Sequence, residues 1–224
     1  MKHEIIITKD GSTSLFVPAF NETYHSKFGA IQEAEHVFLK NGLAAYVTAS
    51  NSTHVKILEI GFGTGLNTLM TLCAAQNLTV SIDYVAIEAF PVPSEIWEKL
   101  NYGTLVGGNN QDTFTQLHDV TWEYTHEINP SFTLTKCQML FQDIEYDTVF
   151  DVIYFDAFGF DVQPELWTEA LFEKMYKALK PNGILVTYAC RTVIKNNMLA
   201  AGFKVEKLPG APGKREMLKA YKII

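Results

Sequence analysis

The chain has 224 residues, of which 47% are hydrophobic and 19% are charged, as in an ordinary soluble globular protein. Its formal net charge of −7 gives it no general attraction to nucleic acid. No apolar run approaches the ~20 residues that a membrane-spanning helix needs, and the first residues lead into a strand-like run instead of a secretory signal.

The charge is distributed unevenly along the chain. Residues 191–224 contain eight Lys and Arg residues and only two acids. A basic surface of this kind is compatible with contacts to a few phosphates, and equally with a solvated surface that binds nothing. The three cysteines, Cys73, Cys137 and Cys190, have no metal-site spacing and predict reduced thiols in a cytoplasmic protein.

The start of the chain predicts an extension in front of the main fold. Residues 4–17 have the pattern of a β-hairpin with an Asp-Gly turn, and residues 29–41 carry apolar side chains at helical spacing. The length suits a single domain over 1–224. We therefore expect residues 1–50 to be an N-terminal extension and residues 51–224 to form the core.

From His54 onward, predicted strands and helices alternate. The expected strands are 55–60, 80–87, 132–141, 150–155, 184–190, 203–208 and 215–223, and the expected helices are 65–76, 93–101, 165–179 and 192–201. Residues 180–183 read as a helix stop and turn, and little pattern is visible over 102–130. Such alternation indicates an α/β fold with a doubly wound, mostly parallel sheet. The last two strands are joined by so short a loop that they must form an antiparallel hairpin.

The most informative segment runs from Ile57 to Asn67, with the sequence Ile-Leu-Glu-Ile-Gly-Phe-Gly-Thr-Gly-Leu-Asn. It predicts a buried strand, a turn with glycines at alternate positions (Gly61, Gly63 and Gly65), and a helix start. Glycine lets a ligand lie against the main chain, and the free N–H groups of a helix start bind polar groups. The spacing G-x-G-x-G differs from the dinucleotide fingerprint G-x-G-x-x-G, so a nicotinamide-dependent oxidoreductase is disfavoured. A tight turn without a ligand is the alternative.

Acidic residues end, or closely follow, four predicted strands. They are Glu59, Glu88, Asp143 and Asp156. The carboxyl ends of parallel strands meet at one sheet edge, where four carboxylates repel one another unless a cationic or donor-rich ligand lies between them. For each of these acids the alternative is an ordinary strand-end, turn or helix-capping residue. The six histidines form no ligand-spaced pair, so we expect no metal site.

The glycine turn resembles the first motif of class I S-adenosylmethionine-dependent methyltransferases. Further segments make most of the chain similar to the MnmC-type methyltransferase domains, in particular their stand-alone form, which act on 5-aminomethyl-2-thiouridine in tRNA. These segments are Ile-Glu-Ala-Phe-Pro at 87–91, Phe-Asp-Ala-Phe at 155–158, Pro-Glu-Leu-Trp at 164–167 and Gly-Lys-Arg-Glu-Met at 213–217. Bifunctional members also carry a flavin-dependent oxidase domain, for which this chain has no room, so no FAD is expected. The proline-rich loop 209–213 departs from the family pattern.

The resemblance implies a Rossmann-like class I methyltransferase fold with S-adenosylmethionine as cofactor. The implied cofactor-binding residues are Glu59, Gly61, Gly63, Thr64, Gly65, Asn67, Glu88, Gln142 and Asp143. In this assignment Glu88 accepts the ribose hydroxyls, Asp143 accepts from the adenine amine, and Glu59 faces a cationic group.

The implied substrate is a wobble base in a tRNA anticodon loop, which can be splayed out and stacked. Asp156 is the expected catalytic residue, holding the amine and orienting its lone pair. Phe158 and Tyr24 are expected to bind the base, although ordinary packing would also explain Phe158, and Lys214 and Arg215 to contact phosphates. A methyltransferase for a small amine or a protein side chain, and a non-catalytic cofactor-binding module, remain alternatives. We expect no membrane association and a monomer.

Overall fold

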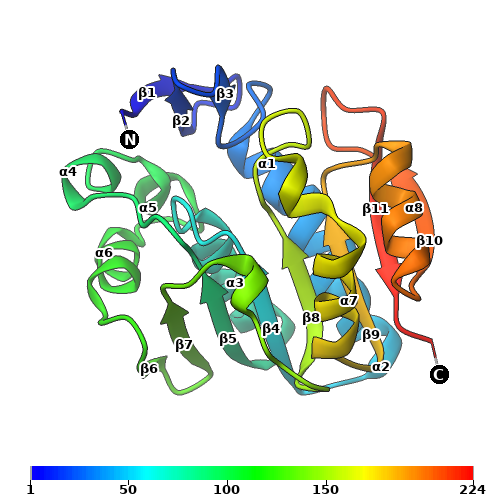
Figure 1. The fold of residues 1–224 in the computed structure, drawn as a ribbon. Coiled ribbons are helices and arrows are strands. Elements are labelled where there is room, and N and C mark those ends of the chain that lie inside the picture. Colours follow the sequence, from blue (N-terminus) through cyan, green and yellow to red (C-terminus); the bar gives the residue numbers. More distant parts are fainter. Residues whose placement is uncertain (1, 224) are drawn as a thin grey trace.

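The computed structural model describes residues 2–223 and has a central sheet with helices on both faces (Figure 1). The strands of this sheet are β4 (His54–Ile60), β5 (Ser81–Ile87), β6 (Thr125–Asn129), β7 (Phe132–Cys137), β8 (Phe150–Phe155), β9 (Leu179–Thr187), β10 (Lys204–Pro209) and β11 (Glu216–Tyr221). Their order across the sheet is β10-β11-β9-β8-β4-β5-β7-β6. Strand order therefore reverses between β4 and β8, the place where open α/β sheets bind ligands.

The pairing confirms a mostly parallel sheet that ends in an antiparallel hairpin. Strands β9, β8, β4, β5 and β7 pair in parallel, whereas β11 runs antiparallel to both β9 and β10. The opposite edge differs from expectation, because β6 pairs antiparallel with β7. The β6 sequence, Thr-His-Glu-Ile-Asn, is mostly polar and lies at an exposed edge, so it carries little strand signal.

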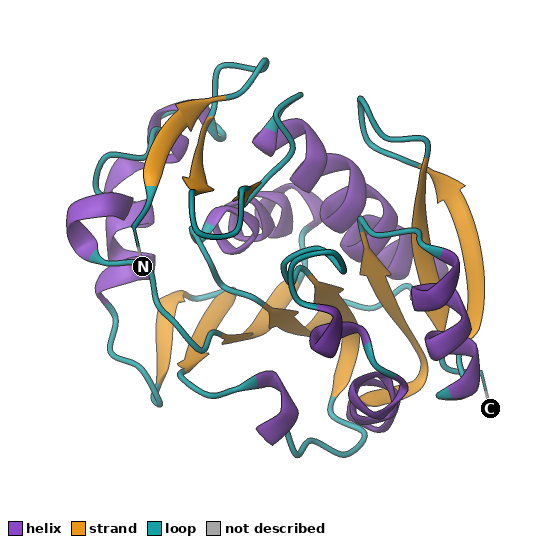
Figure 2. Ribbon diagram, turned by 45° about the horizontal axis from the view of Figure 1, so that its top comes forward, coloured by secondary structure: helices purple, strands orange, loops and turns teal. Residues whose placement is uncertain are grey.

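The helices cover both faces of the sheet (Figures 1 and 2). Their bounds are α1 (Ala30–Ala34), the π-helical stretch η1 (Glu35–Ala44), α2 (Ala45–Ser50), α3 (Leu66–Leu78), α4 (Ser94–Trp97), α5 (Tyr102–Leu105), α6 (Gln111–Asp119), α7 (Glu169–Ala178) and α8 (Thr192–Ala200), with short 3₁₀ turns η2 (Phe141–Asp143) and η3 (Pro164–Trp167). One apolar core lies between the sheet and η1, α3 and α6, and a second lies beneath α7 and α8.

Several predicted boundaries were wrong. The first helix continues as η1 and α2 to Ser50, because the backbone stays helical through Ala44 and Ala45. The helix predicted over 165–179 is divided at Thr168, whose extended backbone ends η3 and whose hydroxyl caps α7. The stop signal over 180–183 lies inside β9 as an irregularity with left-handed Asn182. Only the short α4 forms within 93–101.

The N-terminal segment lies over the carboxyl ends of the central strands (Figure 1). The predicted hairpin is present as β1 (Glu4–Ile7) and β2 (Thr13–Val17), and β3 (Glu22–Thr23) adds a short third strand. Leu15 of β2 packs in the same core cluster as Val37 and Phe38 of η1. The extension is thus placed to close one side of a site at the sheet edge.

Candidate functional site

A cavity of about 780 Å³ lies at the carboxyl ends of β4, β5 and β8, beneath the N-terminal strands. The three strand ends are tied together by backbone hydrogen bonds. The Gly61 N–H donates to the Ile87 carbonyl at 2.9 Å, and the Asp156 N–H donates to the Ile60 carbonyl at 2.9 Å. The cavity wall therefore consists of the segments that follow these strands, together with residues from the N-terminal extension.

The glycine turn forms one wall of the cavity, and a side chain added at each glycine would approach a different neighbouring group. A Cβ at Gly61 would lie 2.7 Å from the Asp156 carbonyl oxygen, and one at Gly65 would lie 2.8 Å from Nε2 of His118. All three glycines have positive φ, between 51° and 96°. Gly61, Gly63 and Thr64 line the cavity, whereas Gly65 lies behind the turn. The backbone is thus bare toward the cavity, as a ligand lying against it requires.

Glu88 lines the same cavity immediately after β5. Its two carboxyl oxygens accept backbone N–H groups, Oε2 from Gly63 at 3.0 Å and Oε1 from Phe90 at 2.9 Å. Burial raises the pKa of Glu88, and these backbone hydrogen bonds act against that shift. The carboxylate is consequently held in one orientation against the glycine turn.

The predicted adenine side is only partly at the cavity. Gln142 of η2 is among the lining residues, as are Gln138, Leu140 and Phe141 of the same segment. Asp143 is exposed and is not among them. A contact from Asp143 to a ligand in this cavity therefore stays a prediction that the geometry does not favour.

Asp156 projects into the cavity directly after β8, and Asn67 holds it. The Nδ2 group of Asn67 donates to Oδ2 of Asp156 at 2.9 Å. Burial in the surrounding protein raises the pKa of Asp156 to about 7, with a further contribution from the negative charge of Glu33. Near neutral pH this carboxyl can therefore both hold and release a proton.

Aromatic side chains line the mouth between the extension and the loop after β8. The Phe158 ring meets the Tyr24 ring edge-on at a centroid distance of 5.0 Å and the Phe20 ring at 5.7 Å. The indole N–H of Trp167 donates to the Phe158 carbonyl at 2.8 Å, which fixes the loop. Phe158 and Tyr24 were predicted for this region, whereas Phe20 and Tyr188 also line the cavity without having been expected there.

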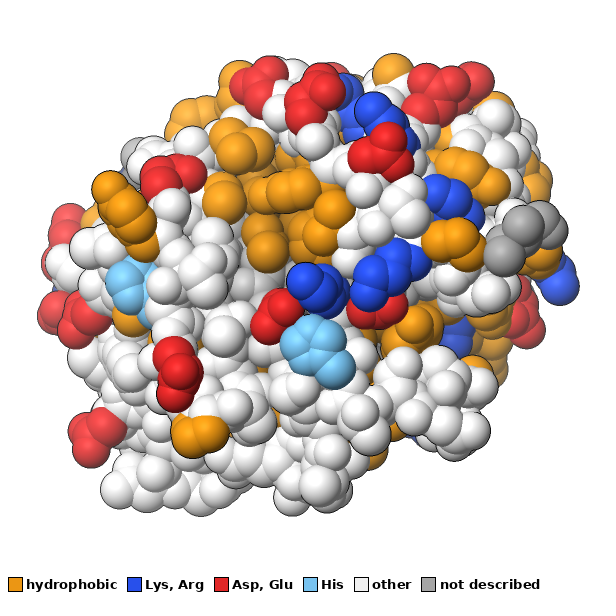
Figure 3. Space-filling model, turned by 90° about the horizontal axis from the view of Figure 1, so that it is seen from below, with side chains coloured by type: hydrophobic (Ala, Val, Ile, Leu, Met, Phe, Trp, Pro, Cys, Tyr) orange, Lys and Arg blue, Asp and Glu red, His pale blue; other side chains and the backbone are white. Residues whose placement is uncertain are grey.

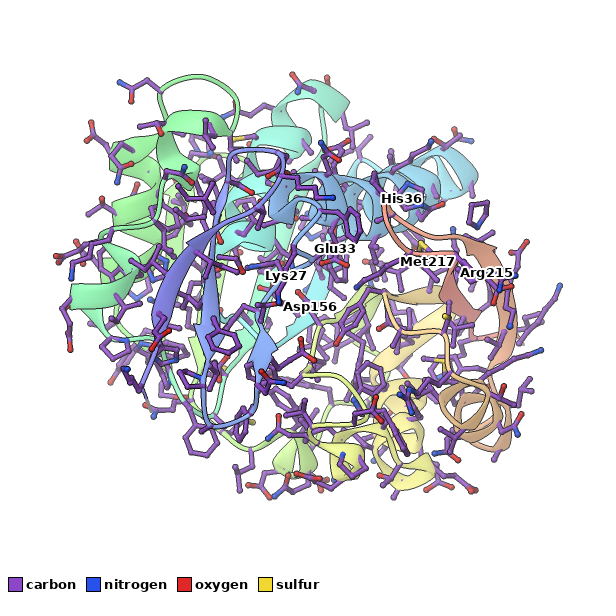
Figure 4. All side chains as sticks on the ribbon, turned by 90° about the horizontal axis from the view of Figure 1, so that it is seen from above. Lys27, Glu33, His36, Asp156, Arg215 and Met217 are labelled. Carbon is purple, nitrogen blue, oxygen red and sulfur yellow. The ribbon has the colours of Figure 1, made fainter. Side chains whose placement is uncertain are left out.

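Lys214 and Arg215 lie outside the cavity lining. The Lys214 ammonium forms an ion pair with the buried carboxylate of Glu33 and lies 4.0 Å from the centroid of the Tyr188 ring. Figure 4 shows Glu33 and Asp156 close together near the centre, with Arg215 off to one side. The phosphate contacts of Lys214 and Arg215 stay predictions; Lys214 is half-buried and paired with Glu33, whereas Arg215 is exposed.

Glu59 lies one layer below the glycine turn, completely buried and not among the lining residues. The hydroxyl of Thr68 donates to its Oε2 at 3.0 Å. Burial, together with the nearby negative charge of Asp156, raises the pKa of Glu59 to about 8. The expectation that Glu59 meets a cationic ligand is therefore not supported by its position.

The opposite face of the molecule, seen from below in Figure 3, has acidic and basic side chains intermixed. Pairs at the amino ends of the strands include Lys56 with Asp83 at 3.3 Å and Lys180 with Asp151 at 2.8 Å. Over residues 2–223, no helix is long and apolar enough to cross a membrane. Within the same residues no cluster of three His, Cys, Asp or Glu side chains could hold a metal ion.

Comparison with known proteins shows the family to which the chain is similar and the fold that it shares. The model of a family described as S-adenosyl-L-methionine-dependent methyltransferase matches residues 110–223. The chain is 28% identical over 219 residues to the tRNA 5-methylaminomethyl-2-thiouridine biosynthesis bifunctional protein MnmC of Aeromonas hydrophila, covering 89% of this chain and 32% of that protein. It is 27% identical over 230 residues to the protein of the same name from Cupriavidus metallidurans, covering 97% and 33%. The chain thus spans about a third of the length of these curated relatives.

Solved structures share the fold. MnmC2 from Aquifex aeolicus superimposes with a TM-score of 0.78 and 23% identity over 99% of this chain and 70% of that one. Spermidine synthase from Thermotoga maritima follows with a TM-score of 0.55 and 16% identity, covering 94% and 69%. At these identities the likeness establishes the fold alone.

Proposed function

The chain belongs to the S-adenosyl-L-methionine-dependent methyltransferase family, and on that premise we propose that it methylates the 5-aminomethyl group of wobble 2-thiouridine in tRNA. The observation that carries the proposal is a carboxyl with a pKa of about 7, Asp156, facing a cavity that also presents a bare glycine turn. The choice of substrate is supported by the relatives, whose names refer to the biosynthesis of tRNA 5-methylaminomethyl-2-thiouridine.

The residues of the cavity fit S-adenosylmethionine. Gly61 and Gly63 leave the backbone open: a Cβ at Gly61 would collide with the Asp156 carbonyl oxygen, and one at Gly63 would lie 3.3 Å from the Tyr24 ring. Glu88 presents a fixed carboxylate suited to a pair of hydroxyl groups. Gln142 offers an amide at the far side. When bound, this cofactor supplies a methyl group activated by a sulfonium.

The protein's own contribution is to align the amine and to manage its proton. An aminomethyl group is mostly protonated near neutral pH and must lose a proton before it can act as a nucleophile. Asp156 can accept that proton, because its raised pKa lies close to neutrality. Asn67 occupies Oδ2, so Oδ1 is the oxygen left for the amine. The aromatic mouth formed by Phe20, Tyr24 and Phe158 then suits a base splayed out of a single-stranded loop.

The test is methyl transfer from labelled S-adenosylmethionine to tRNA that bears 5-aminomethyl-2-thiouridine at the wobble position. We expect label in the 5-methylaminomethyl nucleoside after digestion of the tRNA. The matched control is the same tRNA without the aminomethyl group, which should stay unlabelled. Label in any other nucleoside, or none from a protein that binds the cofactor, would contradict the proposal.

A methyltransferase for a small amine is the second candidate. The net charge of −7 and the engagement of Lys214 by Glu33 favour it, because both weaken the attraction for RNA. Transfer to free amines or to protein lysines, in samples from which RNA has been removed, would support this alternative.

A further inference from the structure

The glycine turn after β4 is held by hydrogen bonds from two sides. On the side of β5, the Glu88 carboxylate accepts the Gly63 N–H group at 3.0 Å. On the other side, Nε2 of His118 lies 3.1 Å from the carbonyl oxygen of Thr64. A carbonyl oxygen can only accept a hydrogen bond, so Nε2 carries the proton and donates it. This second contact comes from α6, a segment far from the turn in the sequence.

The peptide between Thr64 and Gly65 is bonded at both of its ends. Its N–H group, on Gly65, donates to the Phe62 carbonyl at 2.8 Å, and its carbonyl group accepts from His118. A Cβ at Gly65 would lie 2.8 Å from Nε2 of His118, so the imidazole fills the space behind the turn. Because glycine permits many backbone conformations, a turn with three glycines depends on such contacts to keep one shape.

Aromatic side chains hold the His118 ring in place at the end of α6. The ring stacks on Trp97 at a centroid distance of 4.3 Å and an interplanar angle of 11°. Phe114 and Phe62 meet it edge-on at 4.8 and 5.2 Å. Burial lowers the pKa of His118 to about 3, so the ring is neutral near pH 7 and has a single N–H group.

Lys136 of β7 holds the backbone of His118. Its ammonium donates to the His118 carbonyl at 2.5 Å, which is one of the last carbonyls of α6 and therefore has no acceptor role inside the helix. The Lys136 side chain is buried, and its ammonium lies 4.9 Å from the centroid of the Trp122 ring. A cation at this end of a helix is also favoured by the helix dipole. Contacts thus run from β7 through α6 to the glycine turn.

We propose that His118 is a positioning residue for the cofactor: its Nε2–H group holds the Thr64–Gly65 peptide in the orientation that binds S-adenosylmethionine, and Lys136 holds His118. The inference rests on the proposed function in one respect, namely that S-adenosylmethionine occupies this cavity. A turn that already has its binding shape pays no ordering cost when the ligand binds. The segment between β5 and β6, whose sequence shows little pattern, thereby acquires a role in cofactor binding.

Two substitutions separate the hydrogen bond of His118 from its packing. His118→Phe keeps an aromatic ring on Trp97 and removes the donor, whereas His118→Gln keeps an N–H donor. We expect His118→Phe to raise the Kd of S-adenosylmethionine in calorimetry by about two- to tenfold, the usual scale for one hydrogen bond. His118→Gln should recover most of the affinity. The matched control is His126→Phe, which removes an equivalent Nε2 contact of 3.1 Å to the Thr121 carbonyl, and its Kd should equal that of the parent.

Nuclear magnetic resonance can observe the Thr64–Gly65 peptide directly. The dipeptide Thr-Gly occurs once in the sequence, so ¹³C-carbonyl threonine combined with ¹⁵N-glycine gives one correlated signal. Without cofactor, His118→Phe should move the Thr64 carbonyl signal upfield and accelerate hydrogen exchange of the Gly65 N–H group. His118→Gln and His126→Phe should both stay close to the parent. A His118 that only packs against its neighbours would leave this signal unchanged.

Either measurement can overturn the inference. An unchanged Kd or an unchanged Thr64–Gly65 signal in His118→Phe would do so, as would a Gln variant that resembles the Phe variant. If His118→Phe does not fold, Lys136→Met serves as the second variant, and a parent-like Thr64–Gly65 signal there would likewise overturn the inference. A parent that binds S-adenosylmethionine but methylates no RNA would contradict the proposed function alone, because neither measurement uses RNA.

Discussion

Asp156 and Glu88 both face the cavity, but their hydrogen bonds prepare them for different tasks. Each oxygen of Glu88 accepts a backbone N–H group, which favours the ionised form and fixes its direction. Asp156 accepts one amide N–H on Oδ2 and has a pKa of about 7. Glu88 is therefore suited to permanent recognition of hydroxyl groups, and Asp156 to a group whose protonation changes during a cycle.

The first prediction concerns Asp156→Asn. It should reduce methyl transfer by about 100-fold or more, the usual scale for loss of a positioned acid–base group, and leave cofactor affinity unchanged. In the parent, the rate should rise as the pH increases through about 7, because only the ionised Asp156 accepts a proton. The pH–rate profile of the Asn variant should lack this inflection.

The control is Glu169→Gln, which neutralises an exposed acid in the first turn of α7. Its rate and pH profile should equal those of the parent. Near-normal turnover by Asp156→Asn would remove Asp156 from the reaction and leave the proposed mechanism without its proton acceptor.

At the scale of elements, the loop after β8 and the N-terminal extension meet across the cavity mouth. Phe158 from the loop touches Tyr24 and Phe20 from the extension, and the Trp167 indole holds the loop backbone. Base–aromatic stacking contributes about 1–3 kcal/mol per base, so this contact can anchor a splayed-out base with little sequence preference.

The second prediction follows from this geometry. Phe158→Ala should raise KM for the tRNA by about 5- to 150-fold, equivalent to about 1–3 kcal/mol of stacking, with a smaller effect on the Kd of the cofactor. Phe160→Ala is the control, because Phe160 belongs to the same loop but lies outside the cavity lining and packs against Arg191. An unchanged KM for Phe158→Ala would place the base elsewhere.

A second link between elements joins α1 to the loop between β10 and β11. The ion pair of Glu33 and Lys214 lies close enough to Asp156 to act on its protonation, Glu33 raising its pKa and Lys214 lowering it. The pair thus sets the electrostatic environment of the carboxyl from outside the cavity, although neither residue is in its lining.

The third prediction uses the opposite signs of these two charges. Lys214→Met keeps most of the side chain but removes the positive charge, so the inflection in the pH–rate profile should move to higher pH. Glu33→Gln removes the negative charge and should move the inflection to lower pH. Shifts in the same direction, or none in either variant, would contradict the assignment of the inflection to Asp156.

Arg215 differs from its neighbour because it is exposed. The fourth prediction is that Arg215→Ala reduces the slope of log K for tRNA binding against log salt by about one, as expected for the loss of a phosphate contact. The control is Lys56→Ala on the opposite face, where Lys56 pairs with Asp83. If the slope changes in the control and not in Arg215→Ala, the RNA binds a different surface.

At the scale of the whole molecule, sequence patterns were most reliable where the signal was local. The β8 strand, the glycine turn and the antiparallel hairpin were predicted closely, because apolar runs and glycine spacing directly encode them. Placement of Glu88 and Asp156 at the cavity also followed, since acids after parallel strands share one edge. Polar segments such as β6 gave no such signal.

The remaining features depend on tertiary packing. The depth of Glu59 below the turn is decided by its neighbours on α3 and β5, which no spacing reveals. The partner of Lys214 is 181 positions earlier in the chain, at Glu33. Phe20 and Tyr188 reach the cavity only because the extension and the end of β9 converge on it.

The free energy of unfolding depends on pH through acidic groups whose pKa values are raised and histidines whose pKa values are lowered. Glu59 and Asp156 have raised pKa values of about 8 and 7, so the folded state binds protons that the unfolded state has lost, and their contribution to stability disappears as the pH rises from about 4 to 8. His25 and His118 have pKa values lowered by burial to about 4 and 3, so their contribution disappears as the pH falls below 6.5. The two effects oppose each other between about 4.5 and 6.5, and between 6.5 and about 8 the two acids dominate, because the pKa of Lys136, lowered by burial, is about 8.

The fifth prediction is therefore a loss of stability on the alkaline side that Glu59→Gln reduces. Urea unfolding of the parent should give a free energy that falls from pH 6.5 to pH 8. In Glu59→Gln the fall should be smaller by up to about 2 kcal/mol, because one titrating proton corresponds to about 1.4 kcal/mol per pH unit. At pH 5 the variant should gain nothing relative to the parent, since Glu59 is protonated there in the folded state. An equal pH dependence of parent and variant would mean that Glu59 does not titrate in this range.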